Sequence, residues 1–293
     1  MGRDYGLRDN AYTGSVMRPR DVLSHVQMFP ARTPTLPPAT HTNSYALGSR
    51  EVVLVEPATP YEDERRAWAE WARALPSAGR TPVAIVVTHH HVDHVGGAEF
   101  LSRELGLPLW AHAETSSRLD APVARELADG DDISLRGPKT DVWRVLHTPG
   151  HAPGHICLHH ATSGSVVVGD MVASVGTILI APGDGDMGAY LEQLERLAAL
   201  GASVALPAHG DPIESPAALF RQYIRHRRMR EDKIVAALEG GARSASELLP
   251  VVYADTPAHL WPIAALSLQA HLDKLCGEGR AAARENVYRL LSG

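Results

Sequence analysis

The segment from residue 89 to residue 94, His-His-His-Val-Asp-His, constrains this chain of 293 residues more than any other feature. It supplies four candidate metal ligands within one turn, namely His89, His91, Asp93 and His94. The apolar run Val83–Val87 precedes it, and the pair Gly96-Gly97 opens the next helical pattern. We therefore expect a strand that runs into a tight turn, where the glycines let the backbone fold closely around a metal.

Alternate positions in this segment separate the candidate ligands into two groups. On an extended backbone, His89 and His91 point to the same side and can bind one metal ion, whereas His90 points away and is expected to be packed or solvated. Asp93 and His94 lie on the turn and can face a second ion. A solvated histidine tract is the alternative, but it leaves the aspartate and the glycine pair as coincidences.

Three later loops each add one candidate ligand. Each loop follows a short apolar strand, which is where α/β proteins place functional groups. The loops are Thr148–His151, Gly169-Asp170 and Pro207–Gly210, and their candidate ligands are His151, Asp170 and His209. One such residue alone would more often be structural. The three together, beside the first cluster, predict a two-metal site that activates water.

Short Val-rich runs alternate with helical patterns between residues 41 and 215, which predicts a layered α/β domain. The expected strands are Glu51–Val55, Pro82–Thr88, Leu107–Trp110, Val142–His147 and Ser165–Gly169. The expected helices are Tyr61–Leu75, Gly97–Leu105 and Ala189–Leu200. Residues 1–40 contain a proline-rich stretch and are expected to form an extended N-terminal arm.

The pattern changes near Ser215, where we place a domain boundary. Residues 216–293 are expected to form a long Arg-rich helix, two further helices and a short hairpin, over 217–240, 244–253, 257–277 and 280–290. This order is typical of a winged helix. The Arg221–Arg230 group is expected to be a solvated helix face, with ion pairs to Glu231 and Asp232, rather than a grip on nucleic acid.

Composition argues against several broad classes of protein. Hydrophobic residues make up 44% of the chain and charged residues 21%, which is ordinary for a globular protein and does not suggest disorder. The net charge of −6 gives no reason to expect whole-molecule attraction to nucleic acid or to a membrane. The N-terminus lacks the apolar core of a signal peptide, so a cytoplasmic location is expected. Cys157 and Cys276 are expected to be small buried apolar residues.

The order of the seven candidate ligands resembles that of the metallo-β-lactamase superfamily over roughly residues 41–215. The resemblance implies an αββα sandwich with the site at one edge of two packed sheets. It also implies that one metal ion is held by His89, His91 and His151. A second is held by Asp93, His94 and His209, and Asp170 bridges the two. Nitrogen and oxygen ligands suit zinc, with iron and manganese as alternatives.

The same positions separate the branches of that superfamily. Several β-lactamases carry a cysteine at the position of Asp170, so antibiotic hydrolysis is disfavoured. The flavin-dependent diiron branch has a glutamate at the position of His91, which disfavours oxygen reduction. No long insertion separates Asp170 from His209, which argues against the nuclease branch with an inserted domain. A hydrolytic mechanism follows, with Asp93 and Asp170 as the catalytic carboxylates.

The C-terminal segment resembles the winged-helix tail of the β-lactamase-like-2 group. That group includes a mitochondrial single-strand endoribonuclease, and fungal acyl-carrier thioesterases resemble it. Family members commonly read Ile-Asp-Thr-Gly where this chain has Val55–Ala58, which leaves the role of Glu56 open. The usual Pro-Gly-His-Gly loop has Ala208 at its second position, and a positive φ there would cost about 1 kcal/mol.

Two side chains near the expected ligands each have two possible roles. His155 either orients a metal ligand or is a buried, hydrogen-bonded structural residue. Tyr190 is expected to pack in the core of a helix rather than to donate a hydrogen bond to an oxyanion.

Three functions are open on the sequence alone. The favoured one is hydrolysis of a small-molecule thioester, ester or lactone, since Thr148–His155 is similar to the corresponding run of glyoxalase II. The second is cleavage of single-stranded RNA, and the third is a non-catalytic interaction protein, against which seven intact ligands argue. The winged helix is expected to pack against the catalytic domain or a twin subunit, so a homodimer is one expected assembly.

Overall fold

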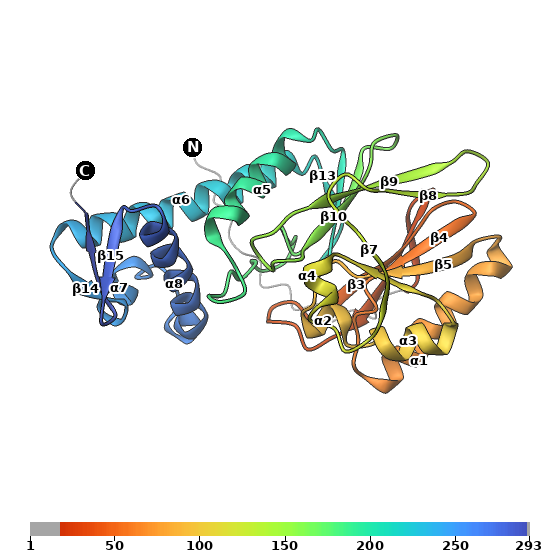
Figure 1. Cartoon of the computed structure of the whole chain (residues 1–293), viewed down its shortest axis with the longest axis horizontal. Coiled ribbons are helices and arrows are strands. Elements are labelled where there is room, and N and C mark those ends of the chain that lie inside the picture. The colour runs from red at the N-terminus through yellow and green to blue at the C-terminus, as the bar shows by residue number, and fades with distance from the viewer. Residues whose placement is uncertain (1–17, 292–293) are drawn as a thin grey trace.

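Two β-sheets form the larger part of this computed structural model, which describes residues 18–291 (Figure 1). The first sheet contains seven strands in chain order, β1 (Arg20–Leu23), β2 (Val26–Arg32), β3 (His41–Leu47), β4 (Glu51–Val55), β5 (Thr81–Val86), β6 (Leu109–Ala111) and β7 (Val123–Glu126). The second contains six in the order β13 (Ile213–Glu214), β12 (Val204–Pro207), β11 (Ser165–Gly169), β10 (Ile156–His160), β9 (Asp141–His147) and β8 (Asp132–Leu135).

The sheets pack face to face because alternate residues of their strands are apolar. Inward side chains such as Val53 and Trp143 meet in one buried cluster between the sheets. Apolar residues on the outer faces are covered by helices, with α1 (Glu62–Ala74) and α3 (Ala98–Leu105) on the first sheet and α5 (Met187–Ala199) on the second (Figure 1). The predicted αββα sandwich is confirmed.

Strand direction brings the loops that carry the predicted ligands to one edge. Strands β4 to β7 run parallel, as do β11 and β12. Strand β10 is antiparallel to both β9 and β11, so β9 ends at the same edge as β11 and β12. The backbone N–H of Ile156 donates to the carbonyl of Thr88 at 3.0 Å, which ties the end of β5 to that edge of the second sheet. Two short helices lie in the connections, α2 (Val92–Val95) and α4 (Ala113–Ser116), and the 3₁₀ turn η1 (Leu75–Ala78) follows α1.

A separate core lies in the C-terminal part of the chain. Helix α6 (Ala217–Glu239) packs against α5 and then continues to this second core (Figure 1). The other elements are β14 (Arg243–Ser244), α7 (Ala245–Val252), the 3₁₀ turn η2 (Ala258–Leu260), α8 (Trp261–Gly277), β15 (Ala281–Arg284) and β16 (Val287–Leu290). Ser244 and Glu247 form a capping box at the start of α7, which fixes where that helix begins. The helices and the small sheet confirm the predicted winged helix.

The arm expected for residues 1–40 differs from the structure where residues are described. Residues 20–32 form β1 and β2 at the edge of the first sheet, with Met28 and Phe29 buried on opposite faces. The prolines at positions 34, 37 and 38 lie in the loop that follows β2. Apolar alternation therefore outweighs the nearby prolines, while residues 1–17 of the expected arm lie outside the described part. None of the helices within residues 18–291 is long and apolar enough to cross a membrane.

Candidate metal centre

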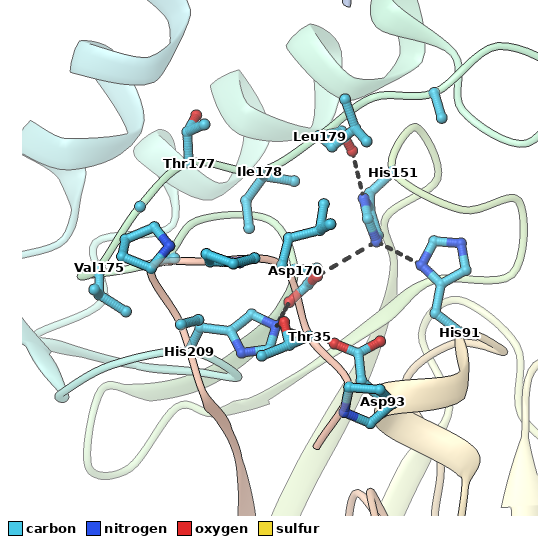
Figure 2. Close-up of a pocket in the computed structure, with 18 residues that line it drawn as sticks. Thr35, His91, Asp93, His151, Asp170, Val175, Thr177, Ile178, Leu179 and His209 are labelled. Atoms are coloured by element: carbon cyan, nitrogen blue, oxygen red, sulfur yellow. Dashed lines mark hydrogen bonds and ion pairs between the residues drawn. The ribbon is translucent and has the colours of Figure 1, made fainter. Parts of the chain in front are cut away.

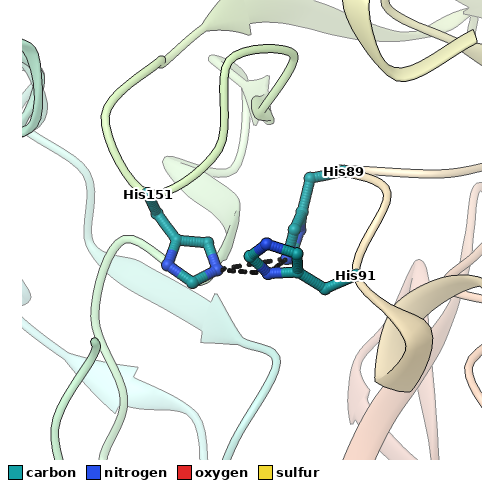
Figure 3. Close-up of side chains that lie close together, drawn as sticks. All are labelled: His89, His91 and His151. Carbon is teal, nitrogen blue, oxygen red and sulfur yellow. Dashed lines mark hydrogen bonds between the residues drawn. The ribbon is translucent and has the colours of Figure 1, made fainter. Parts of the chain in front are cut away.

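Three ring nitrogens converge at the edge where the ligand-bearing loops meet (Figure 3). Nε2 of His89 lies 3.1 Å from Nδ1 of His91, and Nε2 of His151 lies 3.2 Å and 2.9 Å from the same two atoms. Ligands about 2 Å from a tetrahedral zinc ion lie about 3.3 Å apart, so this triangle has nearly the dimensions that a bound cation requires.

The local backbone explains how the first cluster reaches this edge. The chain is extended at His91, which precedes the short helix α2. A Cβ atom on Gly96 would lie 2.8 Å from the backbone nitrogen of Pro60, and one on Gly97 would lie 2.9 Å from the carbonyl oxygen of Thr59. Only glycine therefore lets the turn pack this closely against the preceding loop.

A second group of ligand atoms lies beside the first. Nε2 of His209 is 3.6 Å from Oδ2 of Asp93, and Nε2 of His94 is 3.8 Å from the same oxygen. His94 is fully buried and has no hydrogen-bond partner on either ring nitrogen among the described residues. Unsatisfied buried nitrogens are costly, and a cation facing them would remove that cost.

Asp170 lies between the two groups (Figure 2). Its Oδ2 is 3.4 Å from Nε2 of His151, whereas its Oδ1 is 3.3 Å from Nε2 of His209 and 3.6 Å from Nε2 of His94. The two oxygens of one carboxylate thus face different groups. The structure brings all seven predicted ligands together, and the residues fit divalent cations by ligand type, spacing and burial.

Each of the five histidines also has a polar group beside its second nitrogen. Nδ1 of His151 donates to the carbonyl of Leu179 at 2.9 Å, and Nδ1 of His209 donates to the carbonyl of His41 at 3.0 Å. The remaining partners are the Thr88 hydroxyl for His89 and Asp184 for His91. For His94 the neighbour is Glu56, whose Oε2 lies 3.2 Å from Nδ1 as an ion-pair contact without hydrogen-bond geometry. Such partners fix ring orientation and leave the inner nitrogen free to bind metal.

Buried charges set the protonation of the group. Burial lowers the pKa of His89 well below its ordinary value, assisted by neighbouring histidines, and lowers that of His151 to about 4. Burial would raise the pKa of Asp170, but His209 and His94 outweigh it and hold that pKa well below the usual range. Despite burial, the neighbouring carboxylates raise the pKa of His94 and His209, so these two rings would give up a proton when a metal ion binds. His89 and His151 already favour the neutral form that binds metal.

The structure gives the hydrogen-bond partners of His155 and Tyr190, whose roles the sequence leaves open. His155 is fully buried, and its Nε2 accepts from the backbone N–H of Asp170 at 3.0 Å, so it holds the loop that carries this carboxylate. Tyr190 is also buried and donates to the carbonyl of Met171 at 2.7 Å, so its hydroxyl is already used. Ala208 is not among the residues with positive φ, and the strain considered for it is absent.

Two predictions about other residues need correction. The Arg221–Arg230 group is solvated only in part. Arg221, Arg225 and Arg228 are exposed as expected, whereas Arg227 and Arg230 are buried and donate to the carbonyls of Ile178 and Val252. Glu231 pairs with Lys274 and Arg280 rather than with the arginines of its own helix. Cys157 is buried as expected, whereas Cys276 is only partly buried.

Asp184 was not identified from the sequence. It lies in the turn between residues 181 and 186, and its Oδ2 is 2.6 Å from Nε2 of His91. The run Ala-Pro-Gly-Asp-Gly-Asp marks a turn with two carboxylates. Nothing in that pattern says which histidine a carboxylate would meet. His90, expected to be packed or solvated, also contacts Asp184 at 3.4 Å.

A pocket opens over the ligand groups (Figure 2). One wall is the loop Pro34–Ala39, and the other is the segment between residues 173 and 181. Val175, Ile178 and Leu179 make the second wall mainly apolar. None of the described residues that line the pocket is Lys or Arg.

Comparisons with known proteins agree with this arrangement. The family model of the metallo-beta-lactamase superfamily matches residues 37–209, and that of the beta-lactamase associated winged helix domain matches residues 244–288. The beta-lactamase-like protein 2 homolog of Drosophila melanogaster is 31% identical, over 82% of this chain and 83% of its own. The atrochrysone carboxyl ACP thioesterase of Aspergillus fumigatus is 27% identical, over 74% of this chain and 70% of its own.

Solved structures share the fold across most of the chain. A metallo-beta-lactamase family protein from Thermus thermophilus aligns with a TM-score of 0.75 and 25% identity, over 92% of this chain and all of the other. A beta-lactamase domain protein from Burkholderia ambifaria aligns with a TM-score of 0.80 and 22% identity, over 93% of both chains. Both alignments extend through the C-terminal elements as well as the sandwich.

Proposed function

The chain belongs to the metallo-beta-lactamase superfamily of hydrolases, and from this premise we propose that it uses two divalent metal ions, zinc in the first instance, to hydrolyse a small-molecule thioester, ester or lactone. The observation that carries the proposal is the position of Asp170, whose two oxygens face separate groups of ligand atoms. A carboxylate placed in this way is suited to bridge two ions.

The proposed mechanism gives the side chains of the site two roles, metal binding and proton transfer. One ion would be held by His89, His91 and His151, and the other by Asp93, His94 and His209, with Asp170 between them. When bound, divalent ions lower the pKa of a water ligand and stabilise the oxyanion that develops on the substrate. Asp93 is the least buried of the three carboxylates near the second group, with 15% of its side chain exposed. It faces the pocket, where it would orient the attacking water and accept its proton.

The pocket favours an uncharged acyl group over a polyanion. Its two walls are mainly apolar, and the lining offers no cationic side chain to a phosphate. Arg227 and Arg230 of α6 donate to backbone carbonyls in the interior. The exposed arginines of the same helix, Arg221, Arg225 and Arg228, do not line this pocket. The name of the Aspergillus relative, a thioesterase, supports the same substrate class.

The test measures metal content and then two activities on the same preparations. We expect about two divalent ions per chain, hydrolysis of acyl thioesters and no cleavage of a single-stranded RNA oligomer. The Asp170→Asn variant should lose at least one ion and nearly all hydrolysis. Asp132→Asn is the matched control, because that carboxylate is paired with Arg144 on the surface.

Each other outcome counts against the proposal in a defined way. RNA cleavage with no thioester hydrolysis would favour a nuclease. Full hydrolysis by metal-free protein would overturn the mechanism. A single ion per chain in the wild type would show that the two groups of ligands act as one site.

A further inference from the structure

Among the three histidines of the first group, His91 is the one that solvent reaches. About 32% of its side chain is exposed, whereas His89 is fully buried and only 8% of the His151 side chain is exposed. Burial and hydrogen bonds to the Thr88 hydroxyl and the Leu179 carbonyl hold His89 and His151 in place, whereas burial constrains the ring of His91 less. A ligand in this position needs a specific contact to keep one nitrogen facing the metal.

Asp184 supplies that contact. Its Oδ2 lies 2.6 Å from Nε2 of His91, while Nδ1 on the other side of the ring faces His89 and His151. A carboxylate only accepts hydrogen bonds, so this short contact places the ring proton on Nε2. A neutral imidazole carries a single N–H, and Nδ1 is then left with a free lone pair.

We propose that Asp184 is a positioning residue, which holds the proton of His91 on Nε2 and so directs Nδ1 to the first metal ion. The inference rests on the proposed metal binding by His89, His91 and His151. It adds to that proposal a residue whose loss weakens the site without removing any ligand.

The backbone around Asp184 is built to hold it there. The N–H of Gly185 donates to the carbonyl of Ala181 at 2.7 Å, and the N–H of Asp186 donates to the carbonyl of Gly150 at 2.8 Å. A Cβ atom on Gly185 would lie 2.9 Å from the Ala181 oxygen, so a side chain there would push the turn outward.

The same segment serves two ligands at once. Leu179 accepts the hydrogen bond from His151, and five residues later Asp184 accepts that from His91. One short stretch of chain therefore sets the proton position of two of the three histidines. This arrangement explains why the turn is anchored to Gly150, the residue directly before His151.

A third cation held by His90, His91 and Asp184 is the competing interpretation, since ligand atoms of all three lie close together. The distances argue against it. Around a tetrahedral zinc ion, neighbouring ligand atoms lie about 3.3 Å apart. The separation of 2.6 Å between Asp184 and His91 is that of a direct hydrogen bond.

The experiment compares zinc affinity in wild type, Asp184→Asn, Asp184→Ala and Asp184→Glu, by competition with a chromophoric chelator. We expect affinity for one of the two ions, the one assigned to His89, His91 and His151, to fall about 10- to 100-fold in Asp184→Ala, with partial recovery in Asp184→Glu. Asp132→Asn should bind as the wild type does. Thermal unfolding of the metal-free proteins checks that each variant folds.

A second measurement reads the tautomer directly. Long-range proton–nitrogen NMR of the zinc-loaded wild type should show the proton of His91 on Nε2, with that signal broadened or lost in Asp184→Ala. Wild-type zinc affinity in both Asp184→Ala and Asp184→Asn would overturn the inference and leave the proposed function standing. Failure of the wild type itself to bind zinc would instead overturn the proposed function.

Discussion

At the residue scale, Glu56 is a buried residue with an unusual backbone conformation. Its φ is 62°, in the left-handed region, which costs a non-glycine residue about 1–3 kcal/mol. The backbone is held by the N–H of Glu56, which donates to Val86 at 3.0 Å, and by the Ser44 hydroxyl, which donates to the Glu56 carbonyl. This conformation brings Oε2 to 3.2 Å from Nδ1 of His94, so the longer side chain still reaches the ligand.

The Glu56→Gln variant tests this contact. Glutamine has nearly the same volume as glutamate and must adopt the same strained φ. It lacks the negative charge that favours a proton on Nδ1 of His94. We expect zinc affinity to fall about 10-fold or more, measured by chelator competition. Glu64→Gln is the control, because Glu64 is also buried but pairs with Arg18 away from the ligands. Equal losses in both variants would show that burial, not contact with His94, is responsible.

The ligands themselves could be predicted from the sequence, whereas their outer partners could not. Four of them lie within six residues, namely His89, His91, Asp93 and His94. A pattern this local can be recognised without knowing the fold. Their role as ligands stays a prediction that metal analysis will test. The partner of His91 lies 93 residues away, in a turn whose path depends on how α5 packs. Local sequence patterns do not predict a contact between residues so far apart in the chain.

At the scale of elements, α6 shows why only part of an Arg-rich helix is solvated as expected. Its charged residues occupy more than one face, and no clear apolar stripe marks the buried side. One side of α6 packs against α5 of the sandwich and against α7 and β16 of the C-terminal core. The guanidinium groups of Arg227 and Arg230 on that side donate to carbonyl partners instead of water. Buried charge of this kind is visible only once the neighbouring helices are placed.

Glu231 on the same helix should make stability depend on pH. Burial raises the pKa of its carboxyl, but His271, Lys274 and Arg280 outweigh burial and lower it to about 2. A depressed pKa means that the stabilisation is complete above 4.5 and is lost as the pH falls towards about 2. In metal-free protein, Glu231→Gln should therefore melt below wild type at neutral pH, and the difference should shrink across that range. A pH-independent difference in melting temperature would contradict this account.

Strands and helices with strong periodicity could be predicted to within a few residues. Strands β4, β9 and β11 and helices α1, α3 and α5 coincide closely with the runs expected for them. Short strands such as β7 and β8 were missed, because four residues at the edge of a sheet carry too little alternation to stand out. Their pairing is decided by the neighbouring strands rather than by their own sequence.

At the scale of the whole molecule, the ligands come from both sheets. His89, His91, Asp93 and His94 follow β5 of the first sheet, whereas His151, Asp170 and His209 follow strands of the second. Metal bound by both sets, as proposed, would hold the two layers together. Binding to the folded state alone stabilises it by about 4 kcal/mol when free metal exceeds the dissociation constant 1,000-fold.

Metal removal should therefore lower the melting temperature of the whole sandwich. We expect a drop of roughly 10 °C on treatment with a chelator, since about 1 kcal/mol corresponds to 2–4 °C in a protein of this size. Adding zinc back should restore it. Asp170→Asn, measured by the same calorimetric scan, should respond much less. An unchanged wild-type transition after verified metal removal would contradict the idea that the site joins the layers.

The separation of the ligands along the chain has a further consequence for the order of events. His94 and His209 are brought together only when strands far apart in sequence have already docked. The complete site then cannot guide early folding, because its closure requires the native arrangement of both layers. Bound metal would instead slow unfolding, because it delays the separation of the sheets and so lengthens the lifetime of the native state.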